Sequence, residues 1–132
     1  MRRPNSRWCQ KDKRVAVYIR DGFQCLYCGL DLRQADPRDI TLDHLEPRML
    51  DDQGKPRVKK MANGLSINDV TNIVTACRAC NCSRGCRSWR DFAPGGAQIR
   101  ILHQIQQPTN YALARSLISG RQADLVADVE TR

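Results

Sequence analysis

The chain has few large apolar side chains and no long apolar run. Its 132 residues include seven aromatic residues: two Trp, three Tyr and two Phe. No apolar stretch approaches the roughly 20 residues that are needed to cross a bilayer, so a membrane-spanning protein is not expected. The length fits one small domain. A domain with so little aromatic material often depends on disulfides or a metal for its stability.

A secretory signal is also missing from the pattern. Residues 1–14 contain several basic side chains, but no apolar stretch follows them. We therefore expect a cytoplasmic protein, in which thiols stay reduced. The seven cysteines are an odd number and cannot all pair within the chain. Clustered cysteines in such a protein are more often metal ligands than disulfide partners.

The net charge of +8 is distributed unevenly along the sequence. Basic residues gather in segments 1–20, 55–60 and 78–90, and those considered as contacts to DNA are Arg14, Lys59, Lys60, Arg84 and Arg87. Such clusters attract polyanions, because each contact with a phosphate releases a condensed counterion. A solvated, solubilising surface is the alternative, and the charge alone does not decide between the two.

The first half of the chain predicts short elements and one long loop. Residues 13–20 hold a short apolar run that fits either a helix or a strand. Residues 39–45 alternate as in a short strand, which Pro47 ends. Residues 46–68 are polar and are predicted to form a long loop, and loops of this length inside a small domain are usually functional.

The second half predicts helices. One is expected to start near residue 77 and to run to residue 89 or 92, where Trp89 and Phe92 anchor it, before residues 94–96 break the chain. Apolar residues at helical spacing follow between 99 and 105. Asn110 can cap a last helix over residues 111–119, which Gly120 ends.

Four cysteines form two matched pairs. Cys25 and Cys28 form one Cys-x-x-Cys loop, and Cys77 and Cys80 form another. Two such loops complete a tetrahedral shell of four thiolates, which is the form of a structural zinc site. A redox motif would need only one pair, and buried small apolar residues are the remaining alternative. Four protein ligands leave no open position, so this zinc is expected to hold the fold together without taking part in chemistry.

Polar residues near these pairs suit a second, catalytic metal site. The adjacent Asp43 and His44 offer a hard oxygen ligand and a general base whose ordinary pKa is about 6.5. Neighbours on an ideal strand point to opposite faces, so a kink or bulge is predicted there. Asn81 can offer an amide oxygen, and Asn72 can hold a loop. Taken singly, His44 fits a backbone-bonded strand end, Asn72 a turn residue and Asn81 a helix cap.

Three segments together resemble a known family. The strings RDGFQCLYCG, LDHLEPR and NDVTNIVTACRACNCSRG are similar to the His-Asn-His (HNH) endonucleases, which have a ββα-metal core. The resemblance covers residues 13–92. It implies an α+β fold in which a small ββα-metal core is stapled by a four-cysteine zinc site and has flanking helices. Residues 1–12 would then be a flexible basic arm, 13–92 the nuclease domain, 93–120 a helical extension and 121–132 a flexible tail.

The resemblance also implies a role for each matched residue. It implies that His44 activates the attacking water, that Asp43 and Asn81 bind the catalytic ion, and that Asn72 orients the loop that carries His44. The family often has His where this chain has Asn81. Members with Asn there use it to bind metal. Because an amide oxygen is a harder ligand than imidazole, Mg2+ or Mn2+ is expected at this site, rather than Zn2+ or Ni2+.

The implied activity is metal-dependent hydrolysis of phosphodiester bonds in double-stranded DNA, with no membrane partner. A homodimer, or a place in a phage or restriction assembly, is compatible with the sequence. The chief alternative is a zinc-ribbon-like module that binds nucleic acid without cutting it. That alternative explains the cysteines and the charge but gives the four polar site residues no role.

Cys9, Cys82 and Cys86 are left over from the matched pairs. They are expected to be buried free cysteines, although a second metal site that uses Cys82 and Cys86 with Cys9 or His103 is the alternative. His103 itself is expected to be a packing or surface residue.

Overall fold

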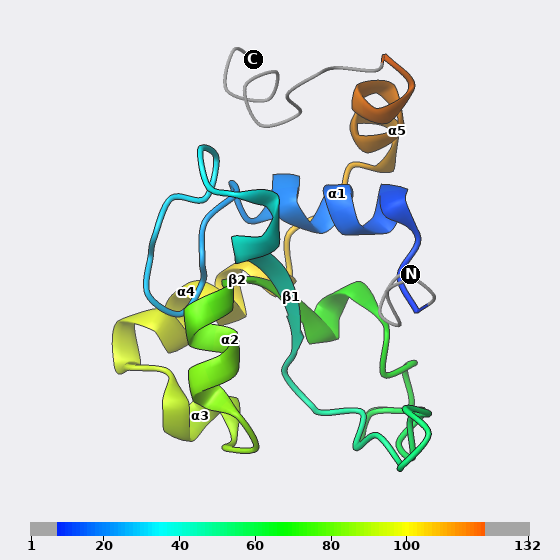
Figure 1. The fold of residues 1–132 in the computed structure, drawn as a ribbon, viewed down its shortest axis with the longest axis vertical. Coiled ribbons are helices and arrows are strands. Elements are labelled where there is room, and N and C mark those ends of the chain that lie inside the picture. The colour runs from blue at the N-terminus through cyan, green and yellow to red at the C-terminus, as the bar shows by residue number, and fades with distance from the viewer. Residues whose placement is uncertain (1–7, 121–132) are drawn as a thin grey trace.

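The computed structural model describes residues 8–120, which form five α-helices and a two-stranded antiparallel sheet (Figure 1). The strands are β1 (Ile40–His44) and β2 (Ile73–Cys77), and the 3-10 helices η2 (Pro37–Asp39) and η3 (Val70–Asn72) precede them. The α-helices are α1 (Lys11–Arg20), α2 (Arg78–Arg84), α3 (Trp89–Phe92), α4 (Gly95–Ile105) and α5 (Tyr111–Ser119). The predicted α+β class is confirmed.

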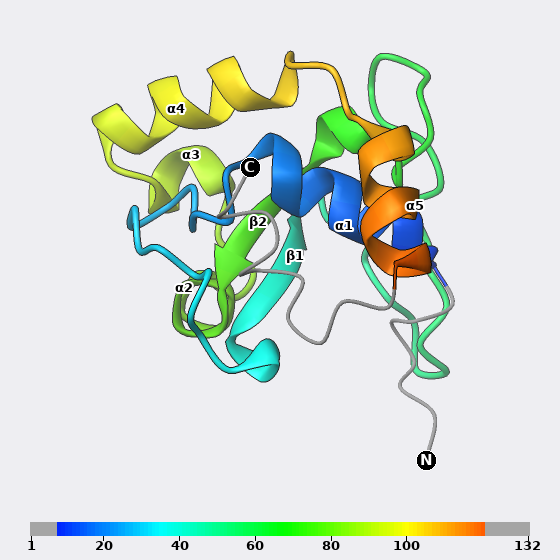
Figure 2. The ribbon, with the colours of Figure 1, turned by 90° about the horizontal axis from the view of Figure 1, so that it is seen from above.

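The strand pair lies at the centre of the fold. β1 and β2 pair in continuous register, from Ile40 opposite Cys77 to His44 opposite Ile73. Two short strands are marginal by themselves, and here every residue of β2 is buried. Helices α1, α2 and α4 all contact β2, and α4 and α5 lie apart with α1 between them (Figures 1 and 2).

Two apolar clusters hold these elements together. The larger joins the first Cys-x-x-Cys loop to β2, α3 and α4, and Trp89 and Ile101 are buried in it with Phe92 packed against them. The smaller joins α1 to α5 through Ala16 and Ala114. Trp89 and Phe92 therefore lie where the sequence predicted them.

The helix predicted from residue 77 to residue 92 is wrong in one respect, because the structure divides it. Gly85 ends α2 with φ 54° and ψ −127°, a conformation that residues with a side chain rarely adopt. Ser88 then caps α3, and its side chain accepts a hydrogen bond from the backbone N–H of Arg90. Two local features therefore divide the predicted helix: Gly85 ends α2, and the Ser88 cap begins α3.

The C-terminal helices follow the prediction with one shift. Gly95 and Gly96, expected to break the chain, form the first turn of α4 after Pro94. Asn110 caps α5 as predicted, since its side chain accepts from Leu113 N at 2.9 Å. Ile99 is 73% exposed, so not every apolar residue of α4 faces the core.

The N-terminal boundary also moves. Residues 13–20 are helical, and because α1 begins at Lys11 the predicted arm overlaps the helix at residues 11 and 12. Residues 1–7 and the predicted tail at 121–132 lie outside the described residues. Within residues 8–120, no helix is long and apolar enough to span a bilayer.

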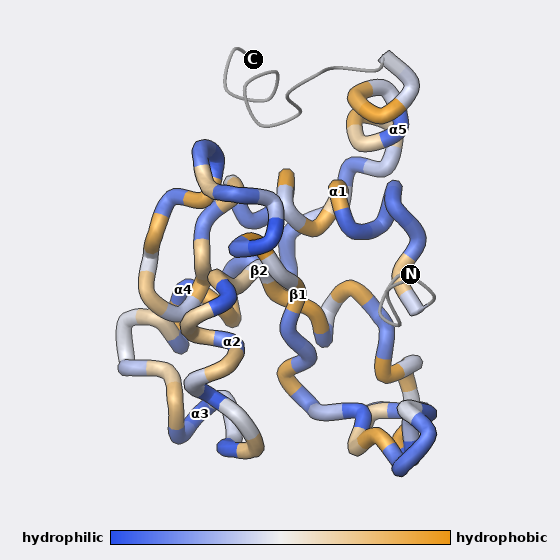
Figure 3. Tube along the Cα trace, in the orientation of Figure 1, coloured by the Kyte–Doolittle hydropathy of each residue, from blue (hydrophilic) through white to orange (hydrophobic). Residues whose placement is uncertain are grey.

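The connection between β1 and η3 is the predicted long loop. It projects away from α3 and α4 at the lower right of Figure 1 and is mainly hydrophilic (Figure 3). Isolated bridges between Leu50 and Pro56 and between Lys60 and Ser66 give it local order without a regular strand. The loop returns beside the end of β1, where Leu45 N donates to Asn72 O at 2.9 Å.

Candidate functional site

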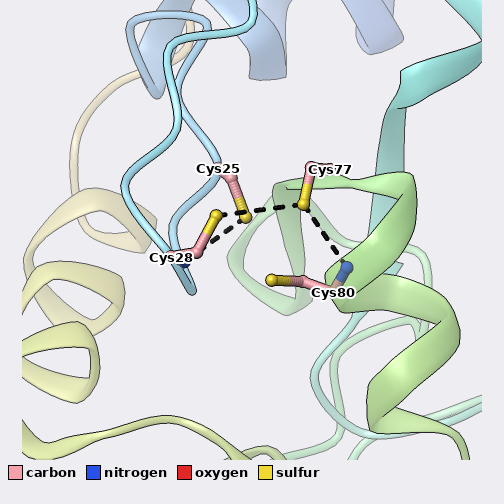
Figure 4. Close-up of side chains that lie close together, drawn as sticks. All are labelled: Cys25, Cys28, Cys77 and Cys80. Atoms are coloured by element: carbon pink, nitrogen blue, oxygen red, sulfur yellow. Dashed lines mark hydrogen bonds between the residues drawn. The ribbon is translucent and has the colours of Figure 1, made fainter.

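The four paired cysteines come together as predicted. Their four sulfur atoms all lie within 4.8 Å of one another (Figure 4). Cys25 and Cys28 come from the loop after α1, Cys77 ends β2 and Cys80 lies in the first turn of α2. Backbone amides support two of the sulfurs: Cys28 N donates to Cys25 Sγ at 3.5 Å, and Cys80 N donates to Cys77 Sγ at 3.3 Å.

This geometry fits a tetrahedral ion. A Zn–S bond of about 2.3 Å in a regular tetrahedron separates the sulfurs by about 3.8 Å. Cys28 Sγ and Cys77 Sγ are 3.9 Å apart. Four thiolates this close repel one another unless a cation lies among them. The cluster can hold one zinc ion.

His44 ends β1 and is 8% exposed. Its Nε2 lies 2.8 Å from Asn68 Oδ1, and its ring lies against the Trp8 ring with centroids 4.4 Å apart. Burial, with a contribution from the nearby Arg48 charge, lowers the pKa of His44 to about 4. The ring is therefore neutral near pH 7, which is the form that accepts a proton.

The Asp43 side chain forms hydrogen bonds with other residues than the His44 side chain does. Its Oδ2 accepts from Tyr27 Oη at 2.6 Å and from Arg84 at 2.7 Å. The predicted kink at this pair is wrong: β1 stays in register, with Asp43 opposite Val74. The two side chains bond to different parts of the protein, yet both line the same cavity. Within residues 8–120, Asp43 Oδ1 has no hydrogen-bond partner.

Asn81 lies on α2 beside β1. Its Nδ2 donates to Thr41 Oγ1 at 3.0 Å and to Leu42 O at 3.3 Å. These bonds fix the amide plane, and in the described part of the chain its Oδ1 accepts no hydrogen bond. Asn81 and Asp43 both line one cavity, and amide and carboxylate oxygens are ligands that a hard divalent ion takes.

Asn72 is 1% exposed and ties the two ends of the long loop together. Its Oδ1 accepts from Glu46 N at 2.8 Å, and its Nδ2 donates to Glu46 O at 3.0 Å and to Ile67 O at 2.8 Å. Glu46 lies two residues after His44, so these bonds hold the segment that carries His44. The arrangement is the loop-holding role that the sequence predicted for an amide at this position.

A cavity of about 1610 Å³ runs over β1 and is lined by Asp43, His44 and Asn81, whereas Asn72 lies outside its lining. Its basic lining residues are Lys11, Arg14, Arg33, Arg38, Arg48, Arg78 and Arg84. Among the described residues that line it, Asp43 is the one carboxylate. Arg33 and Arg38 pair with Asp31 and Asp36 outside the cavity, at 2.8 and 3.2 Å. The cavity is positive and large enough for an extended polyanion.

The residues expected to contact DNA fall into three groups. Arg14 lines the cavity, while Lys59, Lys60 and Arg87 are exposed outside its lining. Arg84 is a correction, because it is 4% exposed and turned inward. Its guanidinium donates to the Asp43 carboxylate and to the carbonyl oxygens of His44 and Leu45, so it supports the site instead of facing solvent.

Three residues beside the site were missed by reasoning from the sequence. Trp8, Tyr27 and Asn68 contact His44 or Asp43, and the sequence assigned none of them a role in the site. Asn68 had a usable signal, since it stands at the end of the long loop, four residues before Asn72. Trp8 and Tyr27 had no such signal. An aromatic residue in a basic N-terminal segment or in a Cys-x-x-Cys loop is normally interpreted as part of the hydrophobic core.

The remaining cysteines are only partly as predicted. Cys9 is buried, as expected, and burial raises the pKa of its thiol. Cys82 and Cys86 are exposed, which corrects the expectation that they are buried: Cys82 lies on α2, and Cys86 follows Gly85, the C-cap of that helix. Within residues 8–120 no second metal cluster includes them. His103 is a surface residue.

Comparison of the chain with protein-family models, with curated proteins and with solved structures found no match.

Proposed function

We propose that the chain is a metal-dependent endonuclease of the HNH type that hydrolyses phosphodiester bonds in double-stranded DNA. One observation carries the proposal: a neutral histidine, a carboxylate oxygen and an amide oxygen line a single positively charged cavity. A binding module has no need for that combination. The chain order β1, β2, α2, with a cluster of four cysteines at the end of the strands, is compatible with a ββα-metal core.

Asp43 and Asn81 would hold the catalytic ion through their Oδ1 atoms. Oxygen ligands of this kind suit Mg2+ or Mn2+, and the ion would polarise a phosphate oxygen and stabilise the leaving 3′ oxygen. Arg84 takes the other oxygen of Asp43 and neutralises part of its charge. We therefore expect the protein alone to bind the ion weakly, and substrate phosphate to complete the site.

His44 is the proposed general base. Its neutral ring takes a proton from a water molecule, the water oxygen bonds to phosphorus, and the bond from phosphorus to the 3′ oxygen breaks. Arg84 fixes the carbonyl oxygens of His44 and Leu45 at 2.7 and 2.8 Å, and Asn72 fixes the segment that follows. The backbone at His44 and in the two residues that follow is therefore fixed, which lowers the entropic cost of orienting the imidazole toward the substrate.

The alternative is a zinc-containing module that binds nucleic acid without cleaving it. The basic cavity would serve that function equally well. The binding module and the nuclease differ in what they predict for Asp43 Oδ1 and Asn81 Oδ1: in a binding module, these two oxygens would bind no metal ion.

A nicking assay tests the proposal. Purified protein with its zinc in place is incubated with supercoiled plasmid and with Mg2+, Mn2+ or no added ion. We expect open-circular product with Mg2+ or Mn2+ and none without a divalent ion. If the protein binds the plasmid but no divalent ion produces nicks, the binding module is the better explanation.

The basic cavity gives a second prediction, on binding. Arg78 is exposed, lines the cavity and forms no ion pair within residues 8–120, so Arg78→Ala removes one expected phosphate contact. The slope of log K against log salt should become shallower by about 1, for any DNA sequence. Arg115→Ala is the control, because Arg115 lies on α5 outside the cavity. Equal slopes for Arg78→Ala and the parent, measured by fluorescence anisotropy without divalent ions, would place DNA elsewhere.

A further inference from the structure

The His44 ring is fixed by a residue from the far end of the long loop. Asn68 Oδ1 lies 2.8 Å from His44 Nε2, while Trp8 lies against the ring. A carbonyl oxygen can only accept a hydrogen bond, so Nε2 must carry the proton. In the neutral ring the lone pair is then on Nδ1.

Asn68 is itself held from several sides. Its backbone N–H donates to Ser66 Oγ at 3.1 Å, and its carbonyl accepts from the Lys13 ammonium of α1. The preceding residue, Ile67, is 2% exposed and receives the Asn72 amide on its carbonyl. The same amide that closes the loop therefore also places Asn68 against His44.

We propose that Asn68 is a positioning residue that fixes His44 as the Nε2–H tautomer and so makes Nδ1 the atom that accepts the proton from water. This inference rests on the proposed function for its catalytic consequence, but the tautomer is a property of the protein without DNA. An asparagine suits the role because it accepts from Nε2 whether or not Nδ1 is protonated, and it does not take up the proton itself.

The tautomer can be read directly. The chain has two histidines, His44 and exposed His103, so 15N-resolved NMR of the imidazole rings gives one site and one internal reference. At pH 8 the parent should show His44 as Nε2–H, and Asn68→Ala should show a mixture of tautomers with His103 unchanged. Asn68→Asp, which keeps an acceptor oxygen in place, should restore Nε2–H.

Activity provides the second measurement. Asn68→Ala should reduce plasmid nicking by about 10- to 100-fold with unchanged zinc content, because the base loses its orientation. Asn68→Asp should recover part of this loss. Asn63→Ala is the matched control from the same loop, since the Asn63 side chain accepts from Leu65 N and, within residues 8–120, forms no hydrogen bond with His44.

The outcomes separate this inference from the proposed function. An Nδ1–H ring in the parent, or a tautomer that Asn68→Ala leaves unchanged, overturns the role of Asn68 even if the protein nicks DNA. A parent that shows the expected tautomers but never nicks DNA removes the proposed function and leaves Asn68 as the residue that orients His44.

Discussion

Cys77→Ser is expected to release the bound zinc and to unfold the domain. Serine is a good helix N-cap, and the Cys77 side chain caps α2 by accepting from Cys80 N. The variant therefore keeps the cap and loses a metal ligand, which separates the two roles of this side chain. Zinc binding in small zinc domains contributes on the order of 10 kcal/mol, so its loss exceeds the stability of an ordinary small domain.

The position of the cluster explains why the effect should be global. It joins the loop after α1 to the end of β2 and the start of α2, and these elements meet around a two-stranded sheet. Loss of the ion removes the link between these segments.

Cys82→Ser is the matched control, because Cys82 is exposed on the same helix and lies outside the cluster. It should keep one zinc per chain and an unchanged melting curve. Zinc content by mass spectrometry and thermal unfolding by circular dichroism measure both variants. A parent protein that stays folded and zinc-free after strong chelation would show that the cluster is not what holds the domain.

The sequence was sufficient for those parts of the fold that local signals specify. The spacing of Cys25, Cys28, Cys77 and Cys80 predicted a cluster, and the structure brings their sulfurs together. Asn110 predicted a cap and the alternation around His44 predicted a strand, and both are present. Each of these features depends on residues within a few positions of one another, or on a pattern that only one chemistry uses.

The site itself could not be predicted in the same way. Asp43 pairs with Arg84 across 41 residues, and Asn81 bonds to Thr41 across 40. The sequence does not distinguish a charged residue that forms such a long-range ion pair from one that faces solvent. For this reason Arg84 was expected to contact DNA. Asn68 reaches His44 because the long loop returns beside β1, whereas Trp8 reaches it from the segment before α1, and no local pattern specifies either approach.

Substitutions at His44 are expected to abolish most cleavage while leaving zinc and DNA binding intact. Loss of a general base costs about 10²- to 10⁴-fold in rate. His44 is buried against Trp8, so His44→Ala also leaves a cavity, and His44→Gln is the cleaner change. A glutamine amide can still donate to Asn68 Oδ1 but cannot take up a proton. His103→Ala, at the exposed histidine, should cut at the parental rate.

Substitutions of the two proposed metal ligands should change cleavage in a different way from substitutions of the general base. Asp43→Asn keeps one acceptor oxygen for Tyr27 and Arg84, but it replaces the other oxygen with an NH2 group and removes the charge that attracts a divalent ion. Its cleavage should fall and should require a higher Mg2+ or Mn2+ concentration, whereas His44→Gln should keep the parental metal dependence. Because Arg84 loses its counter-charge in a buried position, melting temperatures must be compared before rates are interpreted.

Asn81→His distinguishes a metal ligand from a helix residue that merely bonds to β1. Imidazole is softer than an amide oxygen, so a ligand at this position should shift the preference from Mg2+ toward Ni2+ or Zn2+ while keeping some activity. A residue that only anchors α2 through Thr41 and Leu42 would lose activity with every ion alike. Rates with a series of divalent ions, measured by plasmid nicking, separate the two. If His44→Gln cuts as fast as the parent protein, the catalytic assignment is wrong whatever Asn81→His does, because no other neutral imidazole lines the cavity among the described residues.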